Sequence, residues 1–227
     1  VENIEGCTDE LACNYNSDAN TDDDSCDYSC HDNGDYSLIF DGVSDRVGNF
    51  NDDLLYLDGN LTIIFDVKSI ESNGAWHTLI SYYKNGESQD LNVMYNIEIN
   101  PSGNLSYIHE YGNGINIELP SEIFLNDGNW HNIMVSRNVE DKVLDIYHNE
   151  ILVNTYNYSN NPDGGENGIF SIGGYSSYTN GFFDNIKIYS EYSDSISNNN
   201  LVAHYNFNAG TDNILYDRSG NQNHGTI

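Results

Sequence analysis

The first residues whose types and spacing could do chemistry are acidic. Asp18, Asn20, Asp22 and Asp24 alternate along a short stretch near the start of the chain. Alternating side chains that carry oxygen atoms on a short loop are how proteins surround Ca²⁺. We therefore expect a calcium site in this stretch. The alternative is a solvated acidic loop, which would have the same composition.

A second oxygen-rich loop lies near the end of the chain, in the run DRSGNQNHG. It places Asp217, Asn221 and Asn223 close together in the sequence. Carboxylate and amide oxygens are ligands of the kind that Ca²⁺ uses. The alternative is a set of turn residues that bond to their own backbone.

Aromatic residues beside Gly-rich stretches could stack on sugar rings. The candidates lie in predicted loops at the edges of the sheets, where binding residues concentrate. They are Tyr111, Tyr175, Tyr178 and Phe182. The alternative is ordinary packing, because the chain contains 18 tyrosines and must use some of them in its core.

Motifs for hydrolysis are absent or incomplete. The chain has no ExDxxE run of the kind that sandwich glucanases use, and Glu98 and Glu118 each stand alone on their predicted strands. It has no Gly-x-Ser-x-Gly elbow, although a Ser-His-Asp arrangement could still be assembled by the fold. His77 and His131 each follow a tryptophan. We expect each Trp-His pair to begin a strand, with Trp in the core and His at the rim.

The charge balance excludes several partners. There are 36 acidic and 7 basic residues, for a formal net charge of −29. Proteins that bind nucleic acid need clustered Lys and Arg, and anionic membranes also attract basic segments. No apolar run approaches the length of a membrane span, about 20 residues. The chain begins at Val1 without a signal peptide, and we expect a processed or trimmed N terminus.

Cysteine usage points to an oxidising compartment. All four cysteines lie between positions 7 and 30. They form no CxxC pair of the kind that would indicate a zinc site. We expect disulfides and an extracellular or cell-surface location; four cysteines allow three connectivities. Possible N-glycosylation sites occur at Asn60, Asn104 and Asn157, although chance matches are expected in a chain this rich in Asn.

The elements that must position these residues are short strands. From Trp130 to Val153, apolar and polar residues alternate in runs separated by polar turns, which predicts an antiparallel meander. Some twelve such runs predict an all-β antiparallel sandwich. We expect a disulfide-held acidic module over residues 1–30, a polar linker over 31–35 and the sandwich over 36–227.

The first segment resembles the short Cys-rich repeats of secreted marine bacterial proteins. GCTDELACNYNSDANTDDDSCDY, residues 6–28, is close to GCTDxxAxNYNxxAxxDDGSCxY, with Asp24 where the repeat has Gly. Many such repeats carry only the two outer cysteines. The resemblance therefore implies that Cys7 pairs with Cys26, which leaves Cys13 for Cys30.

The remainder resembles the LamG-like jelly-roll domains of the concanavalin A-like lectin/glucanase superfamily. The resemblance rests on SLIFDGVSDRV, LTIIFDVKS, WHNIMVSRN with LDIYHNEILV, and FSIGGYSSYTNGFFDNIKIYSEYSDS, and the tail from Leu201 resembles a segment that accompanies these domains. The hairpin departs from the family's Asp-Gly or Asn-Gly, since Asn149-Glu150 predicts a looser turn. Asn185 replaces the family's closing Glu. The resemblance implies one structural Ca²⁺, with ligands at Asp41, Asp184, Asp217, Asn221 and Asn223.

This fold hosts lectins, adhesion modules and hydrolases, so it does not decide the activity. We expect a secreted or surface module without enzymatic activity that binds a glycan or a surface protein and is stabilised by calcium. The first alternative is a structural subunit that self-assembles into an extracellular homopolymer, a filament or surface layer. The second is a glycoside hydrolase.

Overall fold

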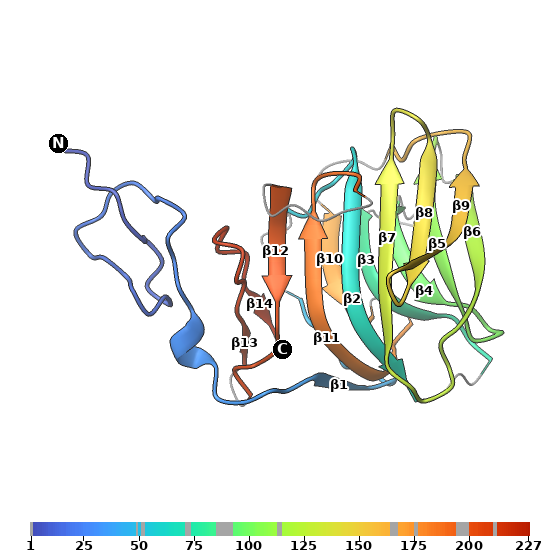
Figure 1. Ribbon diagram of the computed structural model, residues 1–227, viewed down its shortest axis with the longest axis horizontal. Helices are drawn as coiled ribbons and strands as arrows, with labels where there is room; N and C mark the ends of the chain where they lie inside the picture. The colour runs from blue at the N-terminus through green and yellow to red at the C-terminus, as the bar shows by residue number, and fades with distance from the viewer. Residues whose placement is uncertain are drawn as a thin grey trace.

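The computed structural model describes residues 2–48, 50, 53–70, 74–84, 93–112, 115–163, 168–174, 177–193, 200–210 and 213–227. Two antiparallel sheets face each other, and a segment without strands extends from one end of the sandwich (Figure 1). The prediction of an all-β sandwich is confirmed. None of the helices in the described ranges is long and apolar enough to cross a membrane.

The larger sheet has seven strands in the order β1-β11-β2-β7-β8-β9, with β12 also pairing to β11. Its strands are β1 (Leu38–Asp41), β2 (Leu61–Ser69), β7 (His131–Asn138), β8 (Val143–His148), β9 (Ile151–Asn157), β11 (Asn180–Tyr189) and β12 (Leu201–Tyr205). The predicted meander supplies three adjacent strands, β7 to β9. The tail joins the sandwich through β12, as its apolar run predicts.

The smaller sheet has five strands in the order β10-β3-β4-β5-β6. They are β3 (His77–Lys84), β4 (Val93–Ile99), β5 (Asn104–Tyr111), β6 (Ile115–Phe124) and β10 (Gly168–Ile172). The short strands β13 (Ile214–Leu215) and β14 (Gly225–Thr226) pair with each other in the tail. The remaining element is a 3-10 helix, η1 (Ser29–His31).

One hydrophobic core fills the space between the sheets. In β2, Leu61, Ile63, Phe65 and Val67 alternate toward this core and are fully buried. Arg137 is also fully buried, and its guanidinium donates to the carbonyls of Leu57, Gly59 and Met94 and to the Tyr107 hydroxyl. These acceptors satisfy the polar atoms of a cation that would otherwise be costly to bury.

Two of the short runs that alternation predicts as strands, residues 45–50 and 115–119, differ from the structure. The run expected near residues 45–50 makes only isolated bridges, Val47 to Ile172 and Gly48 to Thr226. The strand expected to end before Pro120 instead continues to Phe124 as β6. Pro120 is tolerated there because β6 is the outermost strand of its sheet, where a missing backbone N–H breaks no ladder.

The β8–β9 turn is tight, contrary to the prediction of a looser one. Only Asn149 and Glu150 separate the two strands. Both have positive φ, 50° and 67°. A type I′ turn requires this at its two central residues. The chain therefore makes the family's tight turn without the usual glycine.

Residues 2–30 form the Cys-rich module. Disulfides join Cys7 to Cys26 and Cys13 to Cys30, the pairing that the resemblance implies. The module's small apolar cluster contains Cys7, Ala12 and Tyr28, and it is completed by Tyr216 from the tail. The module therefore packs on the tail and does not close a core of its own.

Candidate functional site

Three polar residues line up across the outer face of the larger sheet. Asp66 on β2 pairs with Asn132 on β7 and, on its other side, with Asp184 on β11. Their neighbours Phe65, Ile133 and Phe183 are fully buried in the core. Because side chains alternate along a strand, the three polar groups point away from that core.

This row lies at a shallow pocket. The cavity has a volume of about 310 Å³ and is lined by Asp66, Trp130, His131, Asn132, Asn149 and Asp184. The lining residues come from β2, the start of β7, the β8–β9 turn and β11. Four separate segments thus meet at one surface depression, which we call the Asp66 pocket.

Hydrogen bonds orient both carboxylates of the pocket. Asn132 Nδ2 donates to Asp66 Oδ1 at 2.7 Å, and Asn185 Nδ2 donates to Asp66 Oδ2 at 3.0 Å. The Asn185 backbone N–H donates to Asp184 Oδ1 at 2.7 Å. Asn185 has φ 49° at a bulge in β11, a conformation that Asn tolerates well. The departure from the family's closing Glu therefore supplies the donor between the two acids.

Burial, together with the charges of Asp66 and Asp35, raises the pKa of Asp184 to about 6. The backbone hydrogen bond from Asn185 opposes this shift. A carboxyl that is partly desolvated beside another carboxylate favours a ligand that offers hydrogen-bond donors or positive charge. Perturbed carboxyls in surface depressions are common at functional sites.

Aromatic surface borders the pocket. Trp130 is 45% exposed, and its ring centroid lies 6.2 Å from that of Phe182. Phe182 lies two residues before Asp184 on β11 and therefore shares its face. Lys68 Nζ lies 5.7 Å from the centroid of the Phe182 ring, so a cation already contacts this aromatic surface.

The predicted arrangement of the Trp-His pairs is wrong. Trp130 and Trp76 are exposed, whereas His131 and His77 are buried. The imidazoles are held inside by polar partners: His77 Nδ1 bonds the Tyr178 carbonyl, and His131 bonds Asp127 and His148, each at 2.9 Å. Hydrophobicity alone predicts a buried Trp and an exposed His. The polar partners of the imidazoles, which the sequence does not reveal, produce the opposite arrangement.

The other predicted aromatic contacts lie elsewhere. Tyr111 ends β5, and Tyr178 makes an isolated bridge with Gly174. Neither lines the Asp66 pocket. Tyr175 lies outside the described residues. Of this predicted set, the structure places only Phe182 beside a candidate site.

The residues of the implied calcium site take local hydrogen-bond partners. Asp41 caps its own turn by accepting from the N–H groups of Val43 and Ser44. The Asp217 oxygens accept from His204, Ser219 and Asn223, and the Asn221 amide donates to the carbonyls of Leu201 and Val202. The tail residues therefore hold their loop together by hydrogen bonds, and Asp184 alone of the implied set lies at the pocket.

The N-terminal acids also take local partners. The Asn20 side chain bonds the backbones of Glu2 and Ile4, and Asp22 accepts from Gln222 of the tail. Asp18 and Asp24 do not join Asp22 in any group of three possible metal ligands within the described chain. A calcium site in this stretch therefore stays a prediction.

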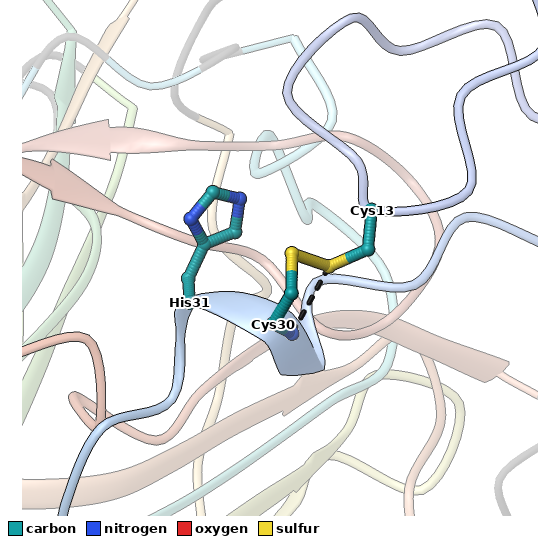
Figure 2. A group of neighbouring side chains, drawn as sticks. All are labelled: Cys13, Cys30 and His31. Atoms are coloured by element: carbon teal, nitrogen blue, oxygen red, sulfur yellow. Dashed lines mark hydrogen bonds between the residues drawn. A yellow bond between two sulfur atoms is a disulfide. The ribbon is translucent and has the colours of Figure 1, made fainter.

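One group of possible metal ligands does occur in the described ranges: Cys13, Cys30 and His31. Its two sulfur atoms form a disulfide and are not free thiolates (Figure 2). His31 Nε2 bonds the Leu11 carbonyl at 2.8 Å, and its ring stacks on Tyr216 with centroids 4.1 Å apart. This group has a structural role, and the disulfide sulfurs do not offer the thiolates that would bind a metal.

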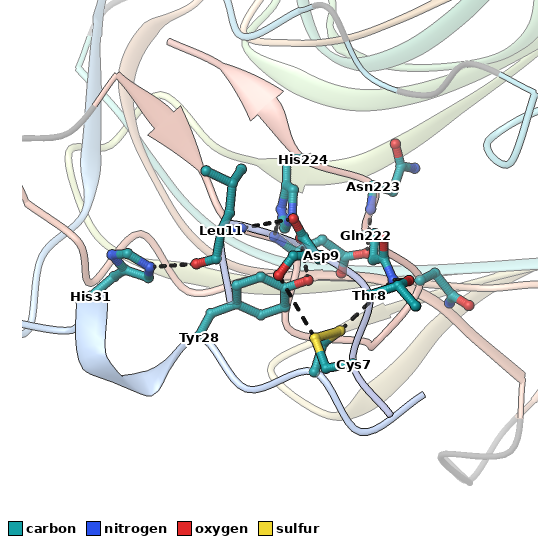
Figure 3. A network of polar contacts seen from close by, with 12 residues as sticks. Cys7, Thr8, Asp9, Leu11, Tyr28, His31, Gln222, Asn223 and His224 are labelled. Atoms are coloured by element: carbon teal, nitrogen blue, oxygen red, sulfur yellow. Dashed lines mark hydrogen bonds and ion pairs between the residues drawn. A yellow bond between two sulfur atoms is a disulfide. The ribbon is translucent and has the colours of Figure 1, made fainter. Parts of the chain in front are cut away.

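A polar network joins the Cys-rich module to the tail (Figure 3). Asp9 Oδ2 accepts from the Tyr28 hydroxyl at 2.6 Å and from His224 Nε2 at 2.7 Å. The Asp217 N–H donates to His224 Nδ1, which leaves the proton on Nε2, facing Asp9. Arg218 also pairs with Asp32. Residues 31–35, expected as a linker, are thereby attached to the tail.

The two lone glutamates lie on the smaller sheet. Glu98 on β4 is 5% exposed, and burial raises its pKa to about 7. Asn96 Nδ2 donates to one of its oxygens at 2.6 Å. Glu118 is exposed on β6, with β5 between the two strands. The two acids therefore differ in access to solvent, and the charge of Glu118 contributes to the raised pKa of Glu98.

The possible glycosylation sites differ in access. Asn157 is exposed at the end of β9. Asn60 and Asn104 are half-buried, and Asn60 Oδ1 accepts from the Val139 N–H at 2.9 Å. A glycan at Asn157 would meet the least obstruction.

Sequence reasoning missed Asp66, Trp130, Asn132 and Asn149. Their signal was present but incomplete, because alternation along each strand already places Asp66 and Asn132 on the face opposite the core residues. The missing information was the register between β2, β7 and β11, which brings them side by side.

The comparisons with known proteins agree with this architecture. A family model described as the concanavalin A-like lectin/glucanases superfamily matches residues 40–194, and the chain belongs to this family. A search of curated proteins found no match to this sequence.

Three solved structures illustrate the likeness. The carbohydrate-binding module CBM40 of the Ruminococcus gnavus IT-sialidase, bound to α2,3-sialyllactose, has a TM-score of 0.58 at 14% identity, covering 71% of this chain and 96% of that one. A putative carbohydrate-binding protein of Bacteroides ovatus has a TM-score of 0.56 at 13% identity, covering 84% and 57%. A leech intramolecular trans-sialidase has a TM-score of 0.56 at 16% identity, covering 78% and 28%. These likenesses show a shared fold.

Proposed function

We propose that this chain is a non-catalytic glycan-binding module whose ligand site is the Asp66 pocket. The observation that carries the proposal is the exposed Trp130 beside Asp66, Asn132 and Asp184. An indole face can stack on a sugar ring, while carboxylate and amide groups exchange hydrogen bonds with its hydroxyls. Pockets of this kind combine an apolar wall with a few fixed polar groups.

The structural neighbours support the proposal, because two of the three are described as carbohydrate-binding. Their sequence identity to this chain is low, so they support the class of ligand and not the sugar. The two disulfides support a secreted or surface location, since such bonds persist in oxidising compartments.

The charge of the pocket favours a different sugar from the sialyllactose of the CBM40 structure. Asp66 and Asp184 face the site, and the whole chain carries a net charge of −29. A carboxylated or sulfated glycan would be repelled, whereas hydroxyls or an ammonium would find acceptors. When no Ca²⁺ is bound at the pocket, we expect neutral sugars and amino sugars to bind in preference to acidic ones.

A glycan panel tests the function. Chitosan and chitin oligomers of equal length, lactose and sialyllactose are titrated into the protein and followed by calorimetry. We expect Trp130→Ala to weaken binding at least tenfold, about 1.4 kcal/mol. Trp76→Ala is the matched control, because Trp76 is another exposed tryptophan that precedes a buried histidine, and it should bind as the unmodified chain does.

The outcomes separate the two claims. No binding to any sugar, or equal loss in both tryptophan variants, would remove the pocket as the site. Binding of sialyllactose above lactose without Ca²⁺ would overturn the charge preference but keep the function. Release of cleaved products from the panel would contradict a non-catalytic role, and Glu98→Gln and Glu118→Gln would then show whether those acids are responsible.

Calcium stays a prediction, and the Asp66–Asp184 pair is the place where we expect it. Oxygen ligands suit Ca²⁺, and neighbouring water or sugar hydroxyls would complete its shell. The melting temperature is compared in Ca²⁺ and in chelator for the unmodified chain and Asp66→Asn. We expect Ca²⁺ to raise the melting temperature only of the former; no shift in either would remove the metal. The glycan panel is run under both conditions.

A further inference from the structure

Two outer strands lie at the end of the sandwich far from the Cys-rich module (Figure 1). β9 is the last strand of the larger sheet and β6 the last of the smaller one. Among the described strands, each is hydrogen-bonded to a neighbour on one side only. The open side of such a strand presents N–H and C=O groups that can pair with another chain, so stable proteins protect it.

β6 carries recognised protection. Its sequence, INIELPSEIF, contains Glu118, Pro120 and Glu122. Charged side chains repel an incoming strand, and proline removes a backbone donor. The Tyr156 hydroxyl also donates to the Pro120 carbonyl, which occupies one of the backbone acceptors of β6.

β9 lacks the charges and proline that protect β6, although its pairing with β8 shifts register between Ile146 and Tyr147. Its sequence, ILVNTYN, contains no charge, proline or glycine. Ile151, Leu152 and Val153 are 69%, 48% and 45% exposed, and they are consecutive. In a chain with 36 acidic residues, seven uncharged residues on an open edge stand out. Such a strand is a ready partner for another strand of similar character.

We propose that β9 pairs antiparallel with β9 of a second copy of this chain, which joins the two larger sheets into one. The charge pattern selects this occupant, because two strongly acidic molecules approach most easily where neither carries charge. A two-fold axis at Asn154 sets Val153 opposite Thr155. Pairs of β-branched residues stabilise adjacent strands.

The same register places the two Asn154 side chains opposite each other. Asn154 Oδ1 is buried and has no hydrogen-bond partner within the described chain. The amide of the second copy's Asn154 would supply a donor to that oxygen. Two-fold pairing of identical edges closes on itself, so it yields a dimer and not an open filament.

A single strand pair buries little surface, and the two copies repel each other through their net charge. We therefore expect a weak dimer whose population rises with protein concentration and with added salt, because salt screens the repulsion. The glycan proposal is independent, since the Asp66 pocket lies on the sheet face and involves no residue of β9.

Sedimentation equilibrium over a range of protein and salt concentrations tests the proposal. We expect Val153→Lys to raise the dimer dissociation constant at least tenfold, about 1.4 kcal/mol. Ile39→Lys is the matched control, because Ile39 is 56% exposed on β1, and the same charge there should leave the dimer intact. Far-ultraviolet circular dichroism checks that both variants fold.

A monomer at every concentration and salt level in both the unmodified chain and Asn157→Gln overturns the proposal, as does equal weakening by both lysine variants. Asn157→Gln addresses the possible glycan at the end of β9. If native protein is monomeric and Asn157→Gln dimerises through Val153, the edge pairs as proposed and the glycan masks it. Assembly that continues beyond a dimer would contradict the closed two-fold arrangement.

Discussion

The environment of Asp184 destabilises its charged carboxylate in the folded chain, and a bound ligand could compensate for this cost. Its carboxyl is partly desolvated and faces Asp66, so the folded state holds its proton more tightly than the unfolded chain does. This is a common condition at binding sites, where polar groups are arranged for a partner at some expense of stability.

Asp184→Asn should therefore separate stability from binding. Since the folded pKa is about 6 and the ordinary value is near 4, the unmodified chain loses stability as pH rises between these values and stays less stable above them. The Asn variant lacks this loss. We expect its melting temperature at neutral pH to be roughly 1–3 °C higher, since solvent screening limits the effect, while sugar binding falls.

Scanning calorimetry from acid to neutral pH, with calorimetric binding alongside, checks this expectation. Asp141→Asn, at an exposed turn residue away from the pocket, serves as control and should change neither. A variant that is less stable than the unmodified chain at neutral pH would show that Asp184 is structural.

At the scale of single residues, the sequence predicted some members of the site but not which residues lie beside them. Phe182 and Asp184 were predicted separately, one as a sugar contact and one as a metal ligand, and they share one face of β11. Asp66 and Trp130 were not predicted. A long-range register makes them neighbours, and no local pattern reports that register.

The β8–β9 hairpin shows how an element can override the preference of its residues. Glu150 adopts φ 67° between two strands whose pairing leaves room for only two turn residues. Left-handed backbone costs a residue with a Cβ atom about 1–2 kcal/mol. Cross-strand packing along β7, β8 and β9 must exceed this cost, because the turn remains tight.

Glu150→Gly should stabilise the protein, because glycine adopts this conformation without the steric penalty. We expect a gain of about 0.5–1 kcal/mol, after the greater freedom of glycine in the unfolded chain is counted. Chemical denaturation measures the difference. Glu140→Gly is the control, since Glu140 is an exposed turn residue whose φ is not positive, and its replacement should be neutral or destabilising.

Alternation predicted the elements well wherever one face meets the core, as in β2 and β7. It failed at turns and edges. The turn at Asn149 seemed loose because the usual glycine is missing, and β6 seemed to end at Pro120 because proline breaks interior strands. In both cases the answer depended on position within a sheet, which is a property of the fold and not of the segment.

The whole molecule has its module and its tail joined by one polar network. Asp9, Tyr28 and His224 form its centre, and Gln222 and Arg218 add contacts at its margin. Burial raises the pKa of Asp9, but hydrogen bonds from Tyr28, His224 and Leu11 outweigh it and hold that pKa below its usual value. The carboxylate therefore stabilises docking above about pH 4, and the contribution is lost as pH falls through the lower folded value.

His224→Ala should release the module without unfolding the sandwich. It leaves Asp9 with one donor fewer and removes the acceptor for the Asp217 N–H, a loss of about 1–3 kcal/mol from the joint. Hydrogen exchange should show faster exchange within residues 2–30 and near 213–227. His148→Ala, within the sandwich, should leave these segments protected, and equal exchange in both variants would contradict the role of the network.

At this largest scale, the family and the sandwich were predictable, because strand patterns and motif order survive low identity. The joint between module and tail was not. Residues 31–35 have the composition of a linker, yet Asn33 bonds the backbone of Asn208 and Ala209. Contacts between residues so far apart in the sequence depend on surfaces that exist only after both parts have folded.

The joint between Asp9 and His224 also sets an order of events during synthesis. The two residues are 215 positions apart, whereas the disulfides close loops with separations of only 19 and 17. The module can therefore be cross-linked while most of the sandwich is still to be made. Asp9 and Tyr28 on its docking face remain exposed to solvent until the tail has been synthesised. We therefore expect docking of the module on the tail to be the last step of folding.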